Sequence, residues 1–139
     1  MQNLRPILLV EDDRVDAIRV ERALKDLKIT SPLVHLIDGE EALEYLRNEV
    51  NEKPCVILLD LNMPKMSGGE FLEVVKGDEA LKEIAVIVFT TSEAGKDADE
   101  PLTVDVAGYI VKSVSHKEFV EALKIISPYC SLSELPVEK

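Results

Sequence analysis

The chain has 139 residues, of which 46% are apolar, and a formal net charge of −11. This length predicts a single domain with one hydrophobic core, and the apolar share excludes a disordered chain. The acidic balance argues against a nucleic-acid partner, because such binding depends on neutralising phosphates with Lys and Arg. The first residues, MQNLRP, do not form the apolar stretch of a signal peptide, and no apolar run approaches the roughly 20 residues that span a bilayer. We therefore expect a cytoplasmic domain.

Short apolar runs alternate with segments whose apolar residues recur at helical spacing. The runs predict strands at 7–10, 33–37, 55–59, 84–89 and 109–111. The helical spacing predicts helices over 13–27, 39–50, 69–76 and 115–126. Asp13 is expected to cap the first of these helices, Ser115 and Glu118 form a capping box for the last, and Pro128 is expected to stop it.

The predicted connections between strands are too long for hairpins, which indicates a parallel sheet covered by helices on both faces. The segment 93–107 has poor periodicity and contains Pro101, so its helix is the least defined. Neither a second domain nor a repeat is evident. We expect one domain over 1–127 and a polar tail over 128–139, with no effector domain.

Polar and charged residues stand at the ends of the predicted strands. Glu11 and Asp12 follow the first strand, and Asp60 follows the third. Thr90 and Lys112 follow the fourth and fifth. These residues should meet, because the carboxyl ends of parallel strands lie at one edge of the sheet. Crowded carboxylates repel one another and call for a cation, and hard oxygen ligands without His or Cys favour Mg²⁺. With a lysine and a hydroxyl beside them, they suit a phosphoryl group, whose transfer depends on positioning and charge neutralisation.

Asp60 is the residue that we expect to accept this group. It follows a continuous apolar run, CVILL, which fits a strand buried on both faces. It would lie between the acids and the lysine. An aspartate can act as a nucleophile to give an acyl phosphate.

Four motifs in order, ILLVEDD, ILLDLNMPKMSGGEFL, VIVFTTS and GYIVKS, resemble the receiver domains of two-component response regulators. The resemblance covers about residues 5 to 127 and implies a flavodoxin-like (βα)5 domain with strand order 2-1-3-4-5. It implies a phosphoacceptor protein, not an enzyme, that receives its phosphoryl group from a sensor histidine kinase with Mg²⁺ as cofactor. The segments ILLVEDD, DGEEALEYLR and TTS are also similar to small regulators paired with bacterial phytochromes.

The resemblance implies a role for each matching acidic residue. Asp60 is similar to the phosphoacceptor and, with Asp12, to a direct metal ligand. Glu11 matches the acid that binds the metal mainly through water. Asn62 matches the residue that offers its backbone carbonyl to the metal.

The resemblance also implies a conformational switch that signals to a protein partner or to a second copy. Thr90 matches the switch hydroxyl, Lys112 the lysine that pairs with the phosphoryl group, and Tyr109 the aromatic switch residue. The surface that changes would be the face formed by the fourth helix, expected within 93–107, the fifth strand and the last helix. Val120 and Ile125, beside the core stripe of the last helix, either widen its buried face or form an apolar patch on this surface, and we favour the patch.

The chain departs from the family pattern at three places. Ser113 stands where the family usually has Pro after the lysine, often with a cis bond. A cis bond before a non-proline residue costs roughly 2.5–4 kcal/mol, so this turn is either trans, with Lys112 aimed differently, or strained. Ser67 stands where the family often has Asp before Gly68. The segment 93–107, which neighbours the usual output face, departs most.

Other functions remain open from the residues alone. An aspartate-nucleophile phosphatase of the haloacid dehalogenase type needs a second Asp two residues after the nucleophile, where this chain has Asn62. A flavodoxin-like cofactor binder needs a phosphate loop after the first strand, where this chain has acids at 11–13. The intact site residues argue against a degenerate receiver that acts only as a docking module, although Ser113 and the unusual segment 93–107 keep this alternative open.

The two cysteines and two histidines carry no function in this interpretation. Cys55 opens a predicted core strand and Cys130 falls in the predicted tail, so we expect reduced thiols and no structural disulfide. His35 lies in a strand and His116 at a helix start, and neither has other metal-ligating residues beside it. The kinase, the downstream target, the phosphoryl lifetime and the oligomeric state depend on surfaces that the sequence does not reveal.

Overall fold

The computed structural model describes residues 5–60, 68–90, 106–111 and 115–130. Five strands are present in these ranges: β1 (Ile7–Val10), β2 (Leu33–Leu36), β3 (Val56–Leu59), β4 (Ala85–Thr90) and β5 (Gly108–Val111). The helices are α1 (Arg14–Asp26), α2 (Gly39–Arg47), α3 (Gly68–Gly77), α4 (His116–Leu123) and the 3-10 helix η2 (Lys124–Tyr129). Each of these strands and α-helices lies where the sequence pattern predicts one. Most of the segment 93–107 lies outside the described residues.

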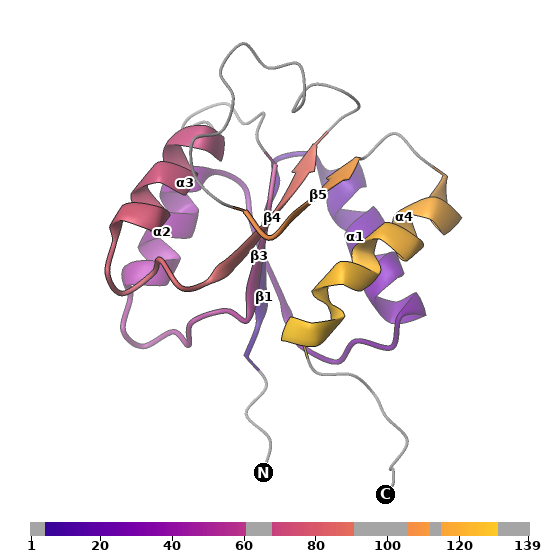
Figure 1. The fold of residues 1–139 in the computed structure, drawn as a ribbon, viewed down its shortest axis with the longest axis horizontal. Helices are drawn as coiled ribbons and strands as arrows, with labels where there is room; N and C mark the ends of the chain where they lie inside the picture. The colour runs from indigo at the N-terminus through magenta and orange to yellow at the C-terminus, as the bar shows by residue number, and fades with distance from the viewer. Residues whose placement is uncertain (1–4, 61–67, 91–105, 112–114, 131–139) are drawn as a thin grey trace, which may run out of the picture.

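The strands form one parallel sheet in the order β2-β1-β3-β4-β5, as predicted. β1 lies between β2 and β3, with Val10 opposite Leu36 on one side and Leu59 on the other. Residues that follow Val10 and Leu59 therefore leave the sheet side by side at its carboxyl edge. α2 and α3 cover one face of the sheet, and α1 and α4 cover the other (Figure 1).

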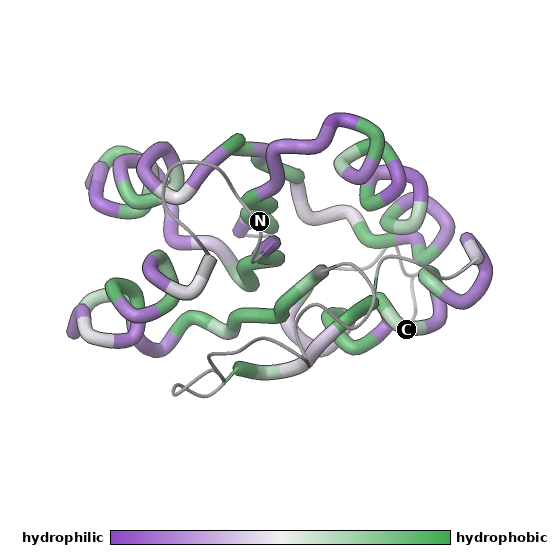
Figure 2. The backbone as a smooth tube through the Cα atoms, turned by 90° about the horizontal axis from the view of Figure 1, so that it is seen from above, coloured by the Kyte–Doolittle hydropathy of each residue, from purple (hydrophilic) through white to green (hydrophobic). Residues whose placement is uncertain are grey.

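Two hydrophobic cores hold the helices to the sheet, one on each face. Side chains alternate along the strands, so Ile7 and Leu9 join the core under α1 and α4, while Leu8 and Val10 join the core under α2 and α3. All four residues of β1 and of β3 are buried, which explains why their sequences are continuous apolar runs. The strands are the hydrophobic centre of the molecule, between helices of mixed hydropathy (Figure 2).

Side-chain caps define where three of the helices begin. Asp13 accepts a hydrogen bond from the Val15 N–H at the start of α1, as predicted, and Asp38 caps α2. Ser115 and Glu118 form the predicted capping box of α4. These caps satisfy backbone N–H groups that have no partner within the helix.

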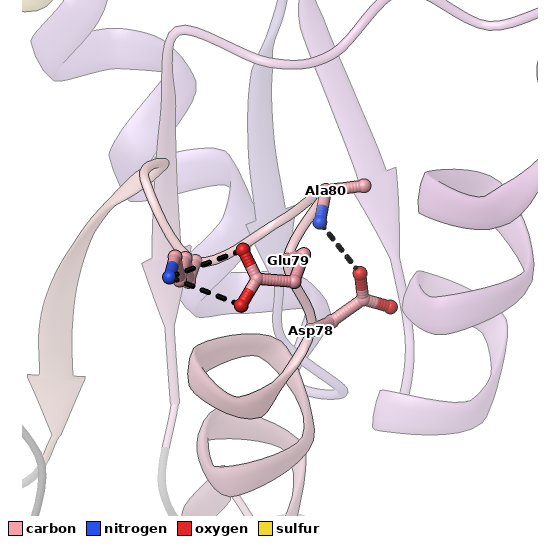
Figure 3. A network of polar contacts seen from close by, with 4 residues as sticks. Asp78, Glu79 and Ala80 are labelled. Carbon is pink, nitrogen blue, oxygen red and sulfur yellow. Dashed lines mark hydrogen bonds and ion pairs between the residues drawn. The ribbon is translucent and has the colours of Figure 1, made fainter.

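A short turn connects α3 to β4. The carboxylate of Asp78 accepts a hydrogen bond of 2.8 Å from the Ala80 N–H, and Lys82 forms an ion pair of 3.2 Å with Glu79 (Figure 3). The hydrogen bond from Ala80 to Asp78 is an Asx turn, which mimics a backbone turn, and the Leu81 and Lys82 N–H groups donate to the Asp78 carbonyl. Its role is structural, since it lies at the amino end of β4.

The end of the last helix differs from the prediction. The α-helix stops at Leu123, and the chain continues as η2, with Pro128 inside this 3-10 helix. Ile126 is fully buried and holds η2 against the core. Cys130 follows η2 and packs against the same core. The boundary at 127/128 stays a prediction, because 131–139 lie outside the described residues.

The two residues of the apolar patch predicted on the last helix differ in exposure. Val120 is half-buried and packs against the core, whereas Ile125 is 40% exposed.

In the described ranges, no helix is both long and apolar enough to cross a membrane. A cytoplasmic location stays a prediction.

Candidate functional site

Three carboxylates converge at the carboxyl edge of the sheet. Glu11 and Asp12 follow β1, and Asp60 follows β3. Each offers an oxygen atom, and these oxygens all lie within 4.8 Å of one another. The predicted meeting of these three acids is therefore seen in the structure.

The sheet itself positions this cluster. The Asp60 N–H donates to the Val10 carbonyl at 3.0 Å, and the Glu11 N–H donates to the Leu36 carbonyl at 3.0 Å. Both bonds continue the strand ladders by one residue, so these two backbones are held as rigidly as the strands. The spacing of the carboxylates follows from the register of β1 and β3.

Glu11 is fully buried and takes part in the start of α1. Its Oε2 accepts a hydrogen bond of 3.0 Å from the Asp13 N–H. A buried carboxylate is costly unless hydrogen bonds or a cation offset its charge. The Asp13 side chain accepts from the Val15 N–H as the cap of α1, and the group of converging oxygens consists of Glu11, Asp12 and Asp60.

His35 contributes a contact that the sequence analysis dismissed. Its Nε2 lies 2.6 Å from the backbone carbonyl of Glu11. Because a carbonyl only accepts, the ring nitrogen donates here. His35 pairs with Leu9 in the register of β2 and β1. This register places the His35 ring near Glu11, and the sequence indicates the contact only once the pairing of the two strands is known.

The three acids differ in exposure in a way that suits a cation and a ligand from solvent. Asp60 is 3% exposed and Glu11 is fully buried, whereas Asp12 is exposed. An all-oxygen set of this kind, with a solvent-facing side, fits a hard divalent cation that keeps several waters, as Mg²⁺ does. A cation there would offset the mutual repulsion of the acids.

The other predicted site residues lie partly outside the described ranges. Thr90 is the last residue of β4 and pairs with Val111, but its side chain is not described, and neither are Asn62 and Lys112. Tyr109 lies on β5 and is 46% exposed. The Lys112–Ser113 bond also lies outside, so its isomer stays an open prediction.

Comparison with known proteins assigns the family. The response regulator receiver domain family matches residues 7–124. The probable methanogenesis regulatory protein FilR2 of Methanothrix harundinacea is 36% identical over 126 residues, which are 88% of this chain and 81% of that protein. The response regulator Rcp1 of Synechocystis is 36% identical over 127 residues, which are 88% of this chain and 86% of that protein.

Solved structures agree with this assignment. The Mn²⁺-bound form of Rcp1 matches with a TM-score of 0.77 and 34% identity, over 97% of this chain and 99% of that one. The phosphorylated cyanobacterial phytochrome response regulator RcpA matches with a TM-score of 0.78 and 34% identity, over 95% of this chain and all of that one. The chain therefore belongs to the response regulator receiver domains, a family of phosphoacceptor signalling proteins rather than classical enzymes.

Proposed function

We propose that this protein is a phosphorylation switch in which Asp60 accepts a phosphoryl group from a sensor histidine kinase. The observation that carries the proposal is the convergence of the Glu11, Asp12 and Asp60 oxygens within 4.8 Å at the mouth of β3. Asp60 is the central member, because it follows β3, the middle strand of the sheet, which is buried along its whole length. Its carboxylate is thus presented at a fixed place at the sheet edge.

The reaction is a transfer between two nucleophiles. A carboxylate oxygen of Asp60 attacks the phosphorus, the P–O bond forms, and the N–P bond of the kinase phosphohistidine breaks, leaving the histidine nitrogen with the electron pair. Glu11, Asp12, Asp60 and the backbone carbonyl of Asn62 would hold Mg²⁺. When bound, this ion neutralises the charge of the transferring phosphoryl oxygens. Lys112 supplies a second positive charge.

Two relatives support both parts of this proposal. Rcp1 has been obtained with Mn²⁺ bound, and RcpA has been obtained phosphorylated. Their structures match this chain with TM-scores of 0.77 and 0.78, over 97% and 95% of its length. By this likeness, the acidic cluster of this chain would bind a divalent ion, and Asp60 would carry the phosphoryl group.

The output would depend on Thr90 and Tyr109. The Thr90 hydroxyl would move to the phosphoryl oxygens, and Tyr109, now 46% exposed, would turn inward. This change would alter the face formed by the segment 93–107, β5 and α4. The protein partner or second copy that reads this face would receive the signal.

The phosphoryl donor would dock beside Asp12. Val15 and Ile18 on α1 and Ile37 after β2 are large apolar side chains that are 46–67% exposed. Ile18 and Ile37 line a surface groove together with Asp12. A groove of this kind suits a helical surface of a kinase that presents its phosphohistidine. Because RcpA is a phytochrome response regulator, a phytochrome kinase is the first candidate for the phosphoryl donor.

The test is intact-mass spectrometry after incubation with acetyl phosphate. We expect one phosphoryl adduct with Mg²⁺, none without Mg²⁺, and none in Asp60→Asn. Asp13→Asn is the matched control, because it removes one carboxylate beside the cluster while Asn still caps α1. This variant should be phosphorylated as the native protein is.

Other outcomes would contradict the proposal. An adduct that persists in Asp60→Asn would place the phosphoacceptor elsewhere. No adduct under any condition would favour the docking module, and phosphate release with rapid turnover would favour the phosphatase.

The partner is tested by transfer from purified, autophosphorylated histidine kinases. We expect the fastest transfer from a phytochrome kinase, and a slower transfer to Ile18→Glu than to the native protein. The same variant should react normally with acetyl phosphate, since a small donor needs no docking surface. Equal rates from all kinases would contradict the phytochrome assignment.

A further inference from the structure

The two cysteines are distant in sequence and adjacent in the fold. Cys55 precedes β3 and Cys130 follows η2, and 75 positions separate them. Their Sγ atoms lie 3.6 Å apart, and both thiols are free. Both are partly exposed and pack at the edge of the core under α1 and α4. Thiols at this distance need only small side-chain movements to reach the S–S bond length of about 2.0 Å.

The backbone on both sides of the contact is held in place. The Cys55 N–H donates to the Pro6 carbonyl at 2.8 Å, and the Cys130 N–H donates to the Ser127 carbonyl at 3.1 Å. Ile126, four residues before Cys130, is fully buried. The two sulfurs are therefore kept together by the fold and not by chance proximity of loose ends.

The surroundings make one of the two thiols reactive. The hydrogen bond from Cys130, more than any other contact, lowers the pKa of Cys55 to about 7, with smaller contributions from Ser31 and from the Arg5 guanidinium. Arg5 is held beside Cys55 by hydrogen bonds of 2.9 Å to the Lys53 carbonyl and 3.2 Å to the Pro54 carbonyl. The hydrogen bond to Cys55 and burial raise the pKa of Cys130.

We propose that Cys55 and Cys130 are a reversible dithiol–disulfide pair that ties the end of η2 to the start of β3. The oxidant is a low-molecular-weight disulfide such as glutathione disulfide. The Cys55 thiolate attacks one sulfur of this disulfide, forms a mixed disulfide and releases one glutathione thiolate. Cys130 then attacks the Cys55 sulfur and displaces the second glutathione, and the thiol protons pass to the released thiolates. Two protein thiols are oxidised and one glutathione disulfide is reduced to two glutathiones.

The electrostatics favour this order of events. Cys55 is the thiol with the lowered pKa, so it is the attacking group. Once it forms the mixed disulfide it carries no charge, and the main cause of the raised pKa of Cys130 disappears. Cys130 is then the resolving thiol.

The pair lies at the opposite end of β3 from Asp60. Cys55 and Asp60 are five residues apart along this strand, which places their backbones about 16 Å apart. The disulfide would anchor the last helical segment to the sheet without touching the acidic cluster. It is therefore a second means of control, independent of phosphorylation.

To test this, the reduced, full-length protein is equilibrated in glutathione redox buffers and quenched with acid. Free thiols are then alkylated, and the products are measured by intact-mass spectrometry. We expect a monomer lighter by two hydrogens with no alkylated cysteine, restored by dithiothreitol. The oxidised form should take up the acetyl-phosphate adduct as the reduced form does. In urea, the equilibrium constant for the internal disulfide should fall by at least about a hundred-fold, because the fold no longer holds the two thiols together.

Single variants separate this pair from a general thiol reaction. Cys130→Ser should stop at the mixed disulfide on Cys55 and should remain folded by circular dichroism. Mixed disulfides on both cysteines of the native protein would overturn the proposal, as would disulfide-linked dimers in place of the internal bond. An equilibrium constant that is the same in urea would overturn it too.

Discussion

Asp12 and Asp60 belong to one acidic cluster but differ in their surroundings. Asp60 is 3% exposed and hydrogen-bonds through its backbone to Val10, whereas the side chain of Asp12 is exposed. A change at Asp12 therefore removes charge from the cluster with little effect on packing. This difference allows metal binding to be separated from folding.

Asp12→Asn should raise the Mg²⁺ concentration needed for half-maximal phosphorylation by at least about ten-fold, because a neutral amide is a weaker ligand for a hard cation. The free energy of unfolding without Mg²⁺ should change by less than about 0.5 kcal/mol. Initial rates with acetyl phosphate over a Mg²⁺ titration measure the first effect. Asp13→Asn is the control, and an unchanged Mg²⁺ requirement in Asp12→Asn would contradict the assigned ligand.

The thiol pair predicts a dependence of stability on pH in the reduced protein. The pKa of Cys55 is lowered from 9.0 to about 7 in the fold, so between these values the unfolded chain binds more protons and stability rises with pH. The pKa of Cys130 is raised in the fold, so its contribution is present below about pH 9 and is lost as the pH rises further.

Urea unfolding at several pH values measures this effect as the difference between the native protein and Cys55→Ser. We expect this difference to grow from pH 7 to pH 9 in favour of the native protein. In Cys130→Ala, the alkylation rate of Cys55 should reach half its maximum at a higher pH than in the native protein. A difference that is flat with pH would contradict the lowered pKa.

At the scale of elements, the last helix combines several local contacts. A capping box starts α4, and this helix packs against both α1 and the sheet. Phe119 is fully buried, and its ring centroid lies 5.4 Å from that of Phe89 of β4, with the two rings tilted by 39°. The Arg19 guanidinium of α1 lies over the Phe119 ring, 4.6 Å from its centroid. His116 pairs with Asp26 at 2.8 Å. The position of α4 is thus set by its cap and its contacts with α1 and β4 together.

Ser115→Ala should lower the free energy of unfolding by about 1 kcal/mol, because the Glu118 N–H loses its acceptor. Ser115→Asn is the matched control, since Asn is an equally good cap and should cost a few tenths of that amount. Urea denaturation followed by circular dichroism measures both. Equal losses in the two variants would show that the cap is not what stabilises α4.

At the scale of the whole molecule, the sheet separates two cores, and β1, β2, β3 and β4 each contribute side chains to both of them. Phe71 belongs to the core under α2 and α3, and Phe119 to the core under α1 and α4. Because β1 and β3 alternate their side chains between the two cores, neither can be lost without disturbing the other. We therefore expect the domain to unfold as one unit.

Phe71→Leu and Phe119→Leu should each lower the free energy of unfolding by about 1–3 kcal/mol, since each leaves a cavity in a fully buried site. Both should keep a single transition with the native slope against urea. Circular dichroism and tyrosine fluorescence should report the same midpoint, with Tyr45 and Tyr129 on elements that cover opposite faces. Separate midpoints in either variant would contradict one cooperative unit.

Local patterns predicted most of the fold because they depend on short stretches of chain. The continuous run from Ile7 to Val10 indicated a strand buried on both faces, and Ser115 with Glu118 indicated a capped helix. The acids at the strand ends predicted a cluster, since parallel strands end at one edge. The end predicted for the last helix was less accurate, because the α-helix stops at Leu123 and a 3-10 helix accommodates Pro128 while Ile126 is packed in the core.

The sequence by itself determined the fold class, the order of the elements and the acids that meet at Asp60, because hydrophobic periodicity, caps and strand ends are written in neighbouring residues. Only the tertiary structure decided the contact of His35 with the Glu11 carbonyl and that of Cys55 with Cys130. Both join segments that no local pattern relates, at separations of 24 and 75 positions. Such contacts exist because the strand register and the packing of η2 bring them together, and a single sequence contains no periodic signal for either.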